Sequence, residues 1–288
     1  MRLKYLAFLA PIIWGSTYFV TTQFLPEDKP LLAAAARALP AGLILTIGRP
    51  LPNRRWLVKL CVLGTLNIGM FFVLLFVAAY RLPGGIVALI GSTQPLLVIL
   101  LSIGLLSNSV TQRQAVAAMI GGLGVVLLIS LPSKNLDAIG VLAALGASIS
   151  MALGLVLTKR WGRPANLRLL TFTGWQLLCG GLVILPILLI TESFPESLSI
   201  MNLLGFLYLA IPGSLLAYFV WFAGLEAFAP VAMSLLGFIS PLVAVTIGFF
   251  LLNQNLSIAQ IIGAALVIGA ILISLDKRNY SGRIQELD

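Results

Sequence analysis

The sequence contains no histidine, and only nine of its 288 residues are acidic. Without histidine, the chain cannot ligate zinc through imidazole, run a histidine proton relay or act as a histidine-dependent intramembrane protease. Its two cysteines, Cys61 and Cys179, lie inside apolar segments and have no spacing typical of a disulfide framework or a metal site. No ATP-binding loop occurs either. We therefore expect two reduced, packed thiols, no metal, no cofactor and no catalytic residues.

Charged residues are also scarce, at 9% of the chain, whereas hydrophobic residues make up 60%. A soluble domain carries about 25% charged residues, so the mean hydropathy of +1.07 indicates an integral membrane protein. The net charge of +9 alone would fit nucleic-acid binding. The basic residues, however, stand at the ends of apolar runs, where they orient a membrane protein. We expect the lipid bilayer and a small-molecule substrate as partners, and no nucleic acid.

Apolar stretches long enough to cross a bilayer as helices recur along the whole chain. They are Leu3–Phe24, Pro30–Ile47, Leu57–Tyr80, Gly84–Leu106, Thr111–Leu131, Leu136–Leu157, Ala165–Ile190, Ile200–Phe228, Pro230–Leu252 and Ser257–Leu275. This pattern predicts an all-α integral membrane protein with ten transmembrane helices. Fourteen basic residues flank one set of helix ends and three flank the other, which predicts that both termini are cytoplasmic.

Two of these stretches, Gly84–Leu106 and Pro230–Leu252, resemble each other and carry a proline near the middle. A shift of 146 residues places Pro95 on Pro241. Proline removes a backbone donor and kinks a helix, and the freed backbone groups are tolerated in a membrane only against protein or a watery cavity. Matched broken helices in two halves of a membrane protein indicate a transport site. We expect Pro95 and Pro241 to be hinges.

Weaker matches connect the other stretches of the two halves in the same order. A shift of 137 aligns the first and sixth stretches, and a shift of 139 aligns the second and seventh, with Arg37 opposite Gln176. The predicted halves are residues 1–132 and residues 133–288, the second with a short cytoplasmic tail. Because each half holds five spans, an odd number, the second is reversed in the membrane. A five-plus-five inverted repeat of this kind suits alternating access.

Five motifs are spread along the chain. They are IIWGSTYFV at 12–20, Arg37 within AAARALPAG, STQPLL at 92–97, TGWQLL at 173–178 and FISPLVA at 238–244. Together they resemble the EamA family of the drug/metabolite transporter superfamily, and within it the PecM-like bacterial permeases. The resemblance implies a ten-helix inner-membrane carrier that most often exports metabolites such as amino acids, with a central cavity lined by helices one, three, four, six, eight and nine. The family commonly has Gly-Glu before the fifth and tenth helices, whereas Asn108 and Gln254 occupy the acidic position here.

Aromatic and polar residues within the apolar stretches are candidates for the wall of a substrate cavity. The predicted substrate-binding residues are Trp14, Thr17, Tyr18, Asn67, Gln94, Gln176, Tyr218, Trp221 and Ser240. An unpaired polar group is costly in hydrocarbon, so each must meet protein, water or substrate. The alternative for each is packing between helices, with threonine bonding back to its own helix. We expect Phe71 and Phe238 to pack rather than to contact ligand.

Arg37 is the basic residue expected inside a span, where a charge is costly and indicates function by default. It could receive a carboxylate or phosphate of the substrate. It could instead snorkel toward the membrane interface or cap carbonyl groups between helices, and its place about seven residues into the span favours such a structural role. Because the acidic residues all fall in loops, tails or span ends, we expect no carboxylate proton relay at mid-membrane.

The sequence thus predicts a secondary transporter of the bacterial inner membrane that moves a small organic metabolite by alternating access. Export of amino acids or amino-acid-derived compounds is the leading expectation, and drugs, pigments or sugars are the alternative substrates. A channel or a non-transport membrane protein is the alternative from another class. An enzyme is not expected, and both a monomer and a homodimer are compatible with the sequence.

Overall fold

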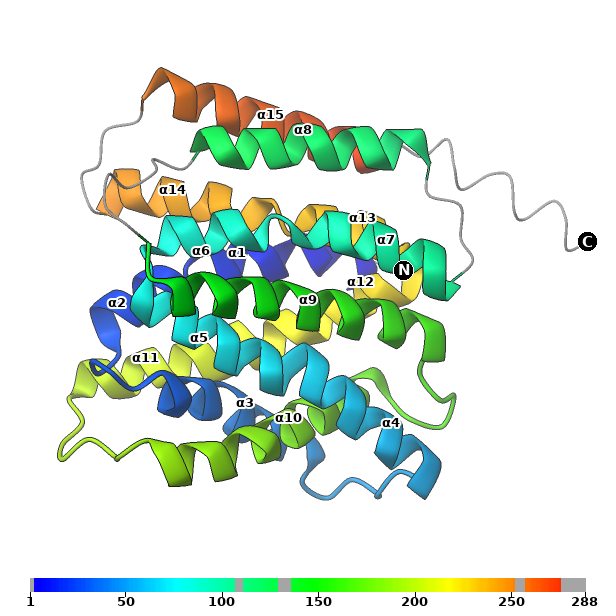
Figure 1. Ribbon diagram of the computed structural model, residues 1–288. Helices are drawn as coiled ribbons and strands as arrows, with labels where there is room; N and C mark the ends of the chain where they lie inside the picture. Colours follow the sequence, from blue (N-terminus) through cyan, green and yellow to red (C-terminus); the bar gives the residue numbers. More distant parts are fainter. Residues whose placement is uncertain (1–2, 107–110, 129–135, 252–256, 276–288) are drawn as a thin grey trace, which may run out of the picture.

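The computed structural model describes residues 3–106, 111–128, 136–251 and 257–275. The regular elements in these ranges are all helices, with no strand among them, and they run side by side along one direction of the molecule (Figure 1). Within the described ranges, the helical segments long and apolar enough to cross a membrane are Arg54–Arg81, Gly84–Leu106, Ala138–Trp161, Leu169–Thr191, Ile200–Ala227 and Pro230–Leu251. Pro30–Thr46, Gln112–Leu128 and Ile258–Ile273 are shorter apolar helices.

The first half begins with a 3-10 turn and continues in helices, several of which join end to end. Its elements are η1 (Leu3–Phe8), α1 (Leu9–Gly15), α2 (Thr17–Phe24), α3 (Pro30–Thr46), α4 (Arg54–Gly64), η2 (Thr65–Met70), α5 (Phe71–Arg81), α6 (Gly84–Gly91), α7 (Gln94–Leu106) and α8 (Gln112–Leu128). Asn53 starts α4 by accepting a hydrogen bond from Trp56 N at 2.9 Å, which satisfies one of the free amides of the first turn.

The second half repeats this order of elements, except that one continuous helix, α9 (Ala138–Trp161), takes the place of η1, α1 and α2. Its elements are α9, α10 (Leu169–Thr191), α11 (Ile200–Ala210), η3 (Ile211–Leu216), α12 (Ala217–Ala227), α13 (Pro230–Leu236), α14 (Ile239–Leu251) and α15 (Ile258–Leu275). Asp137 caps α9 by accepting from Gly140 N at 2.7 Å. Asn108, Gln254 and the predicted boundary at residues 132 and 133 lie outside the described residues.

The two proline-containing segments are interrupted as the sequence predicted. Helix α6 gives way to α7, and α13 to α14, within one turn before Pro95 and Pro241 respectively. At the first break, Thr93 N donates to Ile90 O at 3.1 Å, so the hydrogen bond spans three residues instead of the four of an α-helix. Bonds that span three residues also occur at the second break. The cause is the missing proline N–H, which leaves the carbonyl one turn earlier without its helical partner.

A second pair of irregular turns was not expected from the sequence. The segments η2 and η3 are π-helical, and each lies in the middle of a longer helical run, between α4 and α5 or between α11 and α12. They lie 146 residues apart, which is the shift that relates the two broken helices. Because π-turns are rare and occur frequently at functional sites, their matched positions direct attention to the middle of the bundle.

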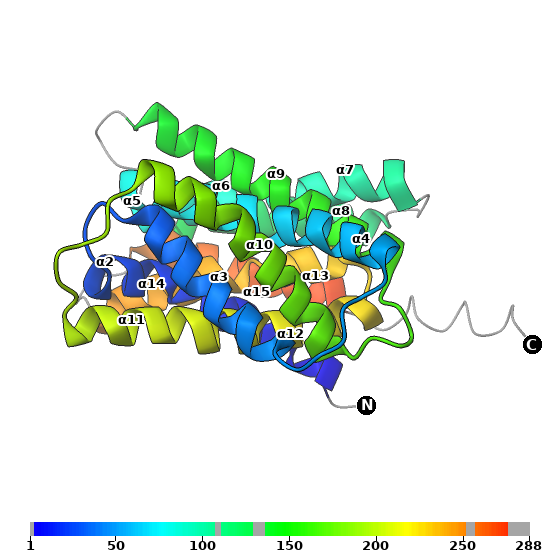
Figure 2. The same ribbon diagram turned by 90° about the horizontal axis from the view of Figure 1, so that it is seen from below.

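Helices of the two halves pack together as equivalent partners. Helix α3 lies against α10, as the view from below shows (Figure 2), and α8 lies against α15 at one edge of the bundle (Figure 1). Helix α1 packs on α12 and α14 of the second half, while α9 packs on α5 and α7 of the first half. At the α4–α10 contact, the sulfur atoms of the free cysteines Cys61 and Cys179 are 3.1 Å apart.

Helices α8 and α15 approach backbone to backbone where two glycines face each other. A Cβ atom added to Gly124 would lie 2.8 Å from Gly263 O, and one added to Gly263 would lie 2.6 Å from Gly124 O. Gly122 and Gly269 on the same two helices differ from this pair, because an added Cβ at either position meets no described atom within 4 Å.

We expect Gly124→Ala to lower the thermal stability of the purified protein, because the facing backbone cannot move aside and overpacking typically costs about 1–3 kcal/mol. Gly122→Ala is the matched control, in the same helix but facing open space, where alanine gains up to about 1 kcal/mol of helix propensity. Fluorescence-detected size exclusion after heating gives both midpoints. Equal midpoints for the two variants would contradict this packing.

Candidate functional site

A cavity of about 110 Å³ lies among the broken helices, which is room for several water molecules. Its wall draws on α1, α2, α3, α5, α6, α7, α9, α12, α13 and α14. Apart from α3, these elements all belong to expected helices one, three, four, six, eight and nine, which the family resemblance implied as the lining of the cavity. The predicted residues on the wall are Trp14, Thr17, Tyr18, Arg37, Gln94, Pro95, Trp221, Ser240 and Pro241.

Three predicted binding residues, Asn67, Gln176 and Tyr218, do not reach this wall. Asn67 Nδ2 donates to Gln176 Oε1 at 2.9 Å and to Thr158 Oγ1 at 3.0 Å. The Tyr218 hydroxyl donates to Asn67 O at 3.0 Å. The structure places these side chains in a buried polar cluster that ties η2 to α9, α10 and α12, in which Asn67 Oδ1 and Gln176 Nε2 have no hydrogen-bond partner among the described residues.

In a neighbouring cluster, the backbone oxygen of Gly213 in η3 accepts two hydrogen bonds. Trp14 Nε1 donates to it at 2.9 Å and Arg37 Nη2 at 3.1 Å. Arg37 Nε also donates to Ser214 Oγ at 3.3 Å, and the guanidinium carbon lies 4.4 Å from the centre of the Phe72 ring. Arg37 is only 1% exposed, so it does not snorkel toward the interface. It caps a carbonyl between helices, which is the other structural role considered from the sequence.

These two clusters occupy equivalent positions in the two halves. Arg37 and Gln176 are related by the shift of 139, and Asn67 and Gly213 by the shift of 146. In one cluster, the amide side chain of the π-turn meets an amide from α10. In the other, the π-turn offers only its backbone, because Gly213 has no side chain, and the longer Arg37 side chain reaches that backbone. The same kind of connection between the two halves is therefore made by neutral groups in one cluster and by a charged group in the other.

Aromatic rings form a large part of the cavity wall. The Trp14 ring lies 5.1 Å, between centroids, from the rings of both Tyr218 and Trp221. Phe71 and Phe238, which we expected to pack rather than to contact ligand, both lie on the wall as well. The sequence could not separate these roles, since a ring that packs between helices can still present one face to a cavity.

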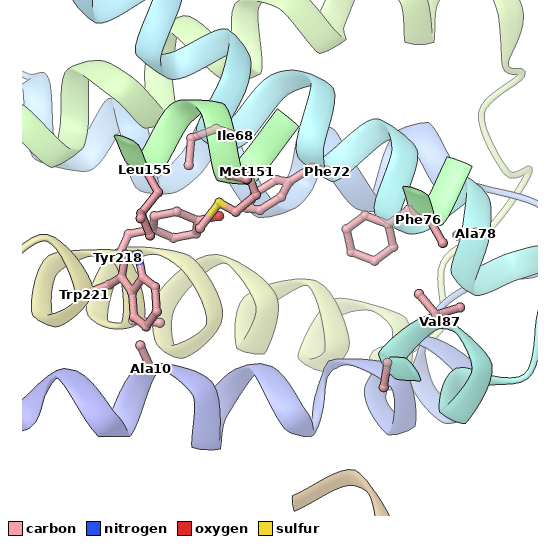
Figure 3. Packing of buried hydrophobic residues seen from close by; sticks show 14 of the residues in the cluster. Ala10, Ile68, Phe72, Phe76, Ala78, Val87, Met151, Leu155, Tyr218 and Trp221 are labelled. Atoms are coloured by element: carbon pink, nitrogen blue, oxygen red, sulfur yellow. The ribbon is translucent and has the colours of Figure 1, made fainter. Parts of the chain in front are cut away.

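Behind this wall, the aromatic residues of α12 pack into the buried core. Figure 3 shows the Tyr218 ring beside Met151 and Leu155 of α9, and Trp221 facing Ala10 of α1. All of these side chains are at least nine-tenths buried. The position of Trp221 on the cavity is thus fixed by dense packing rather than by a mobile loop.

Serine residues on the wall were missed by the sequence analysis. Ser92, Ser148 and Ser234 line the cavity, and each donates its hydroxyl proton to a carbonyl of its own helix. Their oxygen atoms keep lone pairs that can accept further hydrogen bonds. Ser92 belongs to the STQPLL motif that marked the break, whereas Ser148 and Ser234 stand alone in apolar helices and give no local signal.

Three polar atoms of wall residues are buried without a hydrogen-bond partner among the described residues. They are Thr17 Oγ1, Arg37 Nη1 and Trp221 Nε1. The indole and guanidinium groups can only donate, and a hydroxyl can donate or accept. Unsatisfied buried groups are unusual in native proteins and indicate a missing water, ion or ligand. The wall can therefore supply hydrogen bonds to a ligand that accepts them.

Two further contacts join helix ends at opposite ends of the bundle, because the α4–α5 and α11–α12 runs point in opposite directions (Figure 1). At one end, the Tyr80 hydroxyl donates to Pro26 O at 2.9 Å. At the other, Arg163 forms an ion pair with Glu226. Glu226 follows Tyr80 by 146 residues and Arg163 follows Pro26 by 137. The two contacts are thus repeat equivalents of each other.

We expect Asn67→Ala to destabilise the protein by about 1–3 kcal/mol, because it leaves buried polar partners unsatisfied. Gln94→Ala, which also removes a side-chain amide but at a half-buried position of the cavity wall, should leave the thermal midpoint close to wild type. Thermal denaturation of both detergent-purified variants measures the difference. A midpoint loss in Gln94→Ala as large as in Asn67→Ala would show that the two amides were assigned to the wrong environments.

Comparison with known proteins gives matches along both halves. The chain matches the EamA-like transporter family over residues 3–130 and 138–275. It is 62% identical over 283 residues to Protein PecM of Dickeya dadantii, covering 98% of this chain and 95% of that protein. It is 27% identical to a Salmonella typhimurium protein named "Probable amino-acid metabolite efflux pump", with 94% of each chain covered. A crystal structure with 18% sequence identity aligns with a TM-score of 0.77 over 96% of this chain and 98% of that one, which shows a shared fold.

Proposed function

The chain belongs to the EamA-like transporter family, and from this we propose that it is a secondary transporter that moves a small organic metabolite by alternating access. The proposed location is the bacterial inner membrane and the proposed direction is outward. Amino acids or amino-acid-derived compounds are the leading substrate class, supported by the similarity to a protein named as an amino-acid metabolite efflux pump. Drugs, pigments and sugars are the alternative substrates.

The observation that carries this proposal is the position of the cavity. It lies where two broken helices, one from each half, meet at their interruptions, and both hinge prolines line it. Transporters built from repeats bind substrate at the interface of the repeats, near the middle of the membrane, and use discontinuous helices to do so. The aromatic and hydroxyl groups on the wall suit a compound with an apolar body and a few polar groups.

Several features support ten membrane spans arranged as a five-plus-five inverted repeat. The family matches the chain twice, over residues 3–130 and 138–275. The broken helices and the π-turns recur at one shift, and equivalent helices pack against each other across the two halves. The excess of basic residues at one set of helix ends supports cytoplasmic termini.

In this proposal, the contacts at the two ends of the bundle are the two closures that alternating access requires. Opening either end requires breaking its own contact, Tyr80 with Pro26 or Arg163 with Glu226. Because the contacts are repeat equivalents, one half can adopt the arrangement of the other, which exchanges the open end. A channel, the competing class, needs both ends open at once.

Counterflow in proteoliposomes tests the proposal. Vesicles with purified protein are preloaded in turn with neutral, aromatic and basic amino acids, a sugar and a cationic dye. We expect one class to drive uptake of its radiolabelled member against its gradient, because a carrier returns faster when it is loaded. The combined variant Trp14→Ala and Gln94→Ala should abolish this uptake, while Gly122→Ala, away from the cavity, should retain it. Leak that neither saturates nor responds to preloading would instead indicate a channel.

A further inference from the structure

Arg37 carries a positive charge that its structural contacts do not require. The guanidinium ties α3 to η3 through Gly213 O and Ser214 Oγ. In the other half, Gln176 makes the equivalent connection to η2 through Asn67 with neutral amides alone. The connection at this position of the repeat therefore needs hydrogen bonds but no charge. The charge at Arg37 calls for a separate explanation.

No carboxylate of the described residues balances this charge. The described acidic residues Glu27, Asp28, Asp137, Glu192, Glu196 and Glu226 lie in loops, at a cap or in the last turn of a helix. Arg37 is the only charged residue on the described cavity wall, and its side chain is 1% exposed. Its position over the Phe72 ring offsets part of the desolvation cost. A buried guanidinium without a counter-ion remains expensive at membrane depth, and such residues mark substrate pathways.

The unpartnered polar atoms on the described cavity wall share one chemistry, because each can donate a hydrogen bond. Arg37 Nη1 and Trp221 Nε1 are donors on the cavity wall with no described acceptor, and Thr17 Oγ1 can be a third donor. A ligand that satisfies them must accept hydrogen bonds and, because of the guanidinium, is favoured if it is negative. A carboxylate provides both properties. With one cationic group on the described wall, a single negative charge is the natural match.

We propose that Arg37 receives the carboxylate of the transported substrate, and that the substrate is a monoanion with a flat, apolar body. This deepens the proposed function and rests on it, since the same cavity is involved. The rings of Trp14, Tyr18, Phe71, Trp221 and Phe238 supply the surface for that body. No described wall residue offers an acid to pair with an ammonium group, and the charge of Arg37 repels cations. The carboxylate is therefore required, whereas an amine is not.

Four compounds with the same phenyl body test this directly on wild-type protein. They are 3-phenylpropionate, L-phenylalanine, 3-phenylpropionamide and 3-phenylpropylamine, and isothermal titration in detergent gives their affinities. We expect 3-phenylpropionate to bind at least tenfold more tightly than the amide and the amine. L-phenylalanine also carries an ammonium group that finds no acid on the described wall, so it should bind more weakly than 3-phenylpropionate. An amide that binds as tightly as the acid would overturn the proposal. Absence of binding by all four would overturn the assigned substrate class.

Variants of the arginine separate recognition from structure. Arg37→Gln copies Gln176, so it keeps a polar side chain but removes the charge. We expect the ratio of acid to amide affinity to fall by about 10- to 100-fold, as for loss of a hydrogen bond to a charged group. Arg37→Lys should retain most of the ratio. Ser214→Ala, the matched control, removes the acceptor of Arg37 Nε but keeps the charge, so its ratio should stay at the wild-type value.

A purely structural role for Arg37 predicts a different result. Arg37→Gln and Ser214→Ala would then both lower the thermal midpoint. Neither would change the ratio of acid to amide affinity, because only folded protein binds either compound. If Arg37→Gln does not fold, the wild-type ratio and the Arg37→Lys ratio still decide the proposal. Counterflow with another substrate class, together with no preference for acids in binding, would support the proposed transport function and overturn the proposed carboxylate site.

Discussion

A carbonyl group that a helix releases inside a bilayer must find its partner within the protein, because hydrocarbon offers none. Here the Gly213 carbonyl, in a π-turn at the centre of its helical run, accepts from Trp14 and from Arg37. These two bonds hold η3 against α1 and α3, and they bring an indole and a guanidinium to one cavity. The arrangement of the site follows from this single acceptor.

The other irregular turns obey the same constraint with different partners. Helix α1 ends at Gly15, and the hydroxyl of the next residue, Ser16, donates to Ile13 O at 2.7 Å and hydrogen-bonds the Tyr208 hydroxyl at 2.6 Å. In η2, the Asn67 side chain meets Gln176, which is the repeat equivalent of Arg37. Each of these turns is thus held by a polar side chain from another helix. These are also the places where a helix can bend without exposing free backbone groups to lipid.

Much of the fold could be predicted from local rules. The stretch expected at Pro30–Ile47 forms a helix over Pro30–Thr46, and the breaks fall within one turn before Pro95 and Pro241, where the missing donors require them. The resemblance to the EamA family is confirmed by the match over both halves. The π-turn Thr65–Met70 could not be foreseen, because it contains no proline and depends on tertiary partners.

The site was less accessible to prediction, because a helix that is apolar on all sides does not show which face meets the cavity. Asn67 and Gln176 are polar residues in apolar helices, as Gln94 is, yet they meet each other and Gln94 meets the cavity. Arg37 and its acceptor Gly213 are 176 residues apart. The repeat relates Arg37 to Gln176 and Gly213 to Asn67, but neither relation reveals that Arg37 contacts Gly213.

The most direct measurement asks whether the two ends of the bundle open in turn. In a variant with Cys61→Ser and Cys179→Ser, a Ser240→Cys substitution on the cavity wall reports access to an impermeant thiol reagent from each face of the membrane. One end of the bundle is tethered by a cysteine pair, placed either at Pro26 and Tyr80 or at Arg163 and Glu226. A short bis-maleimide joins the pair before the reporter is labelled. Alternating access predicts that each tether stops counterflow and blocks labelling from its own face only. Labelling from both faces with either tether in place would contradict it.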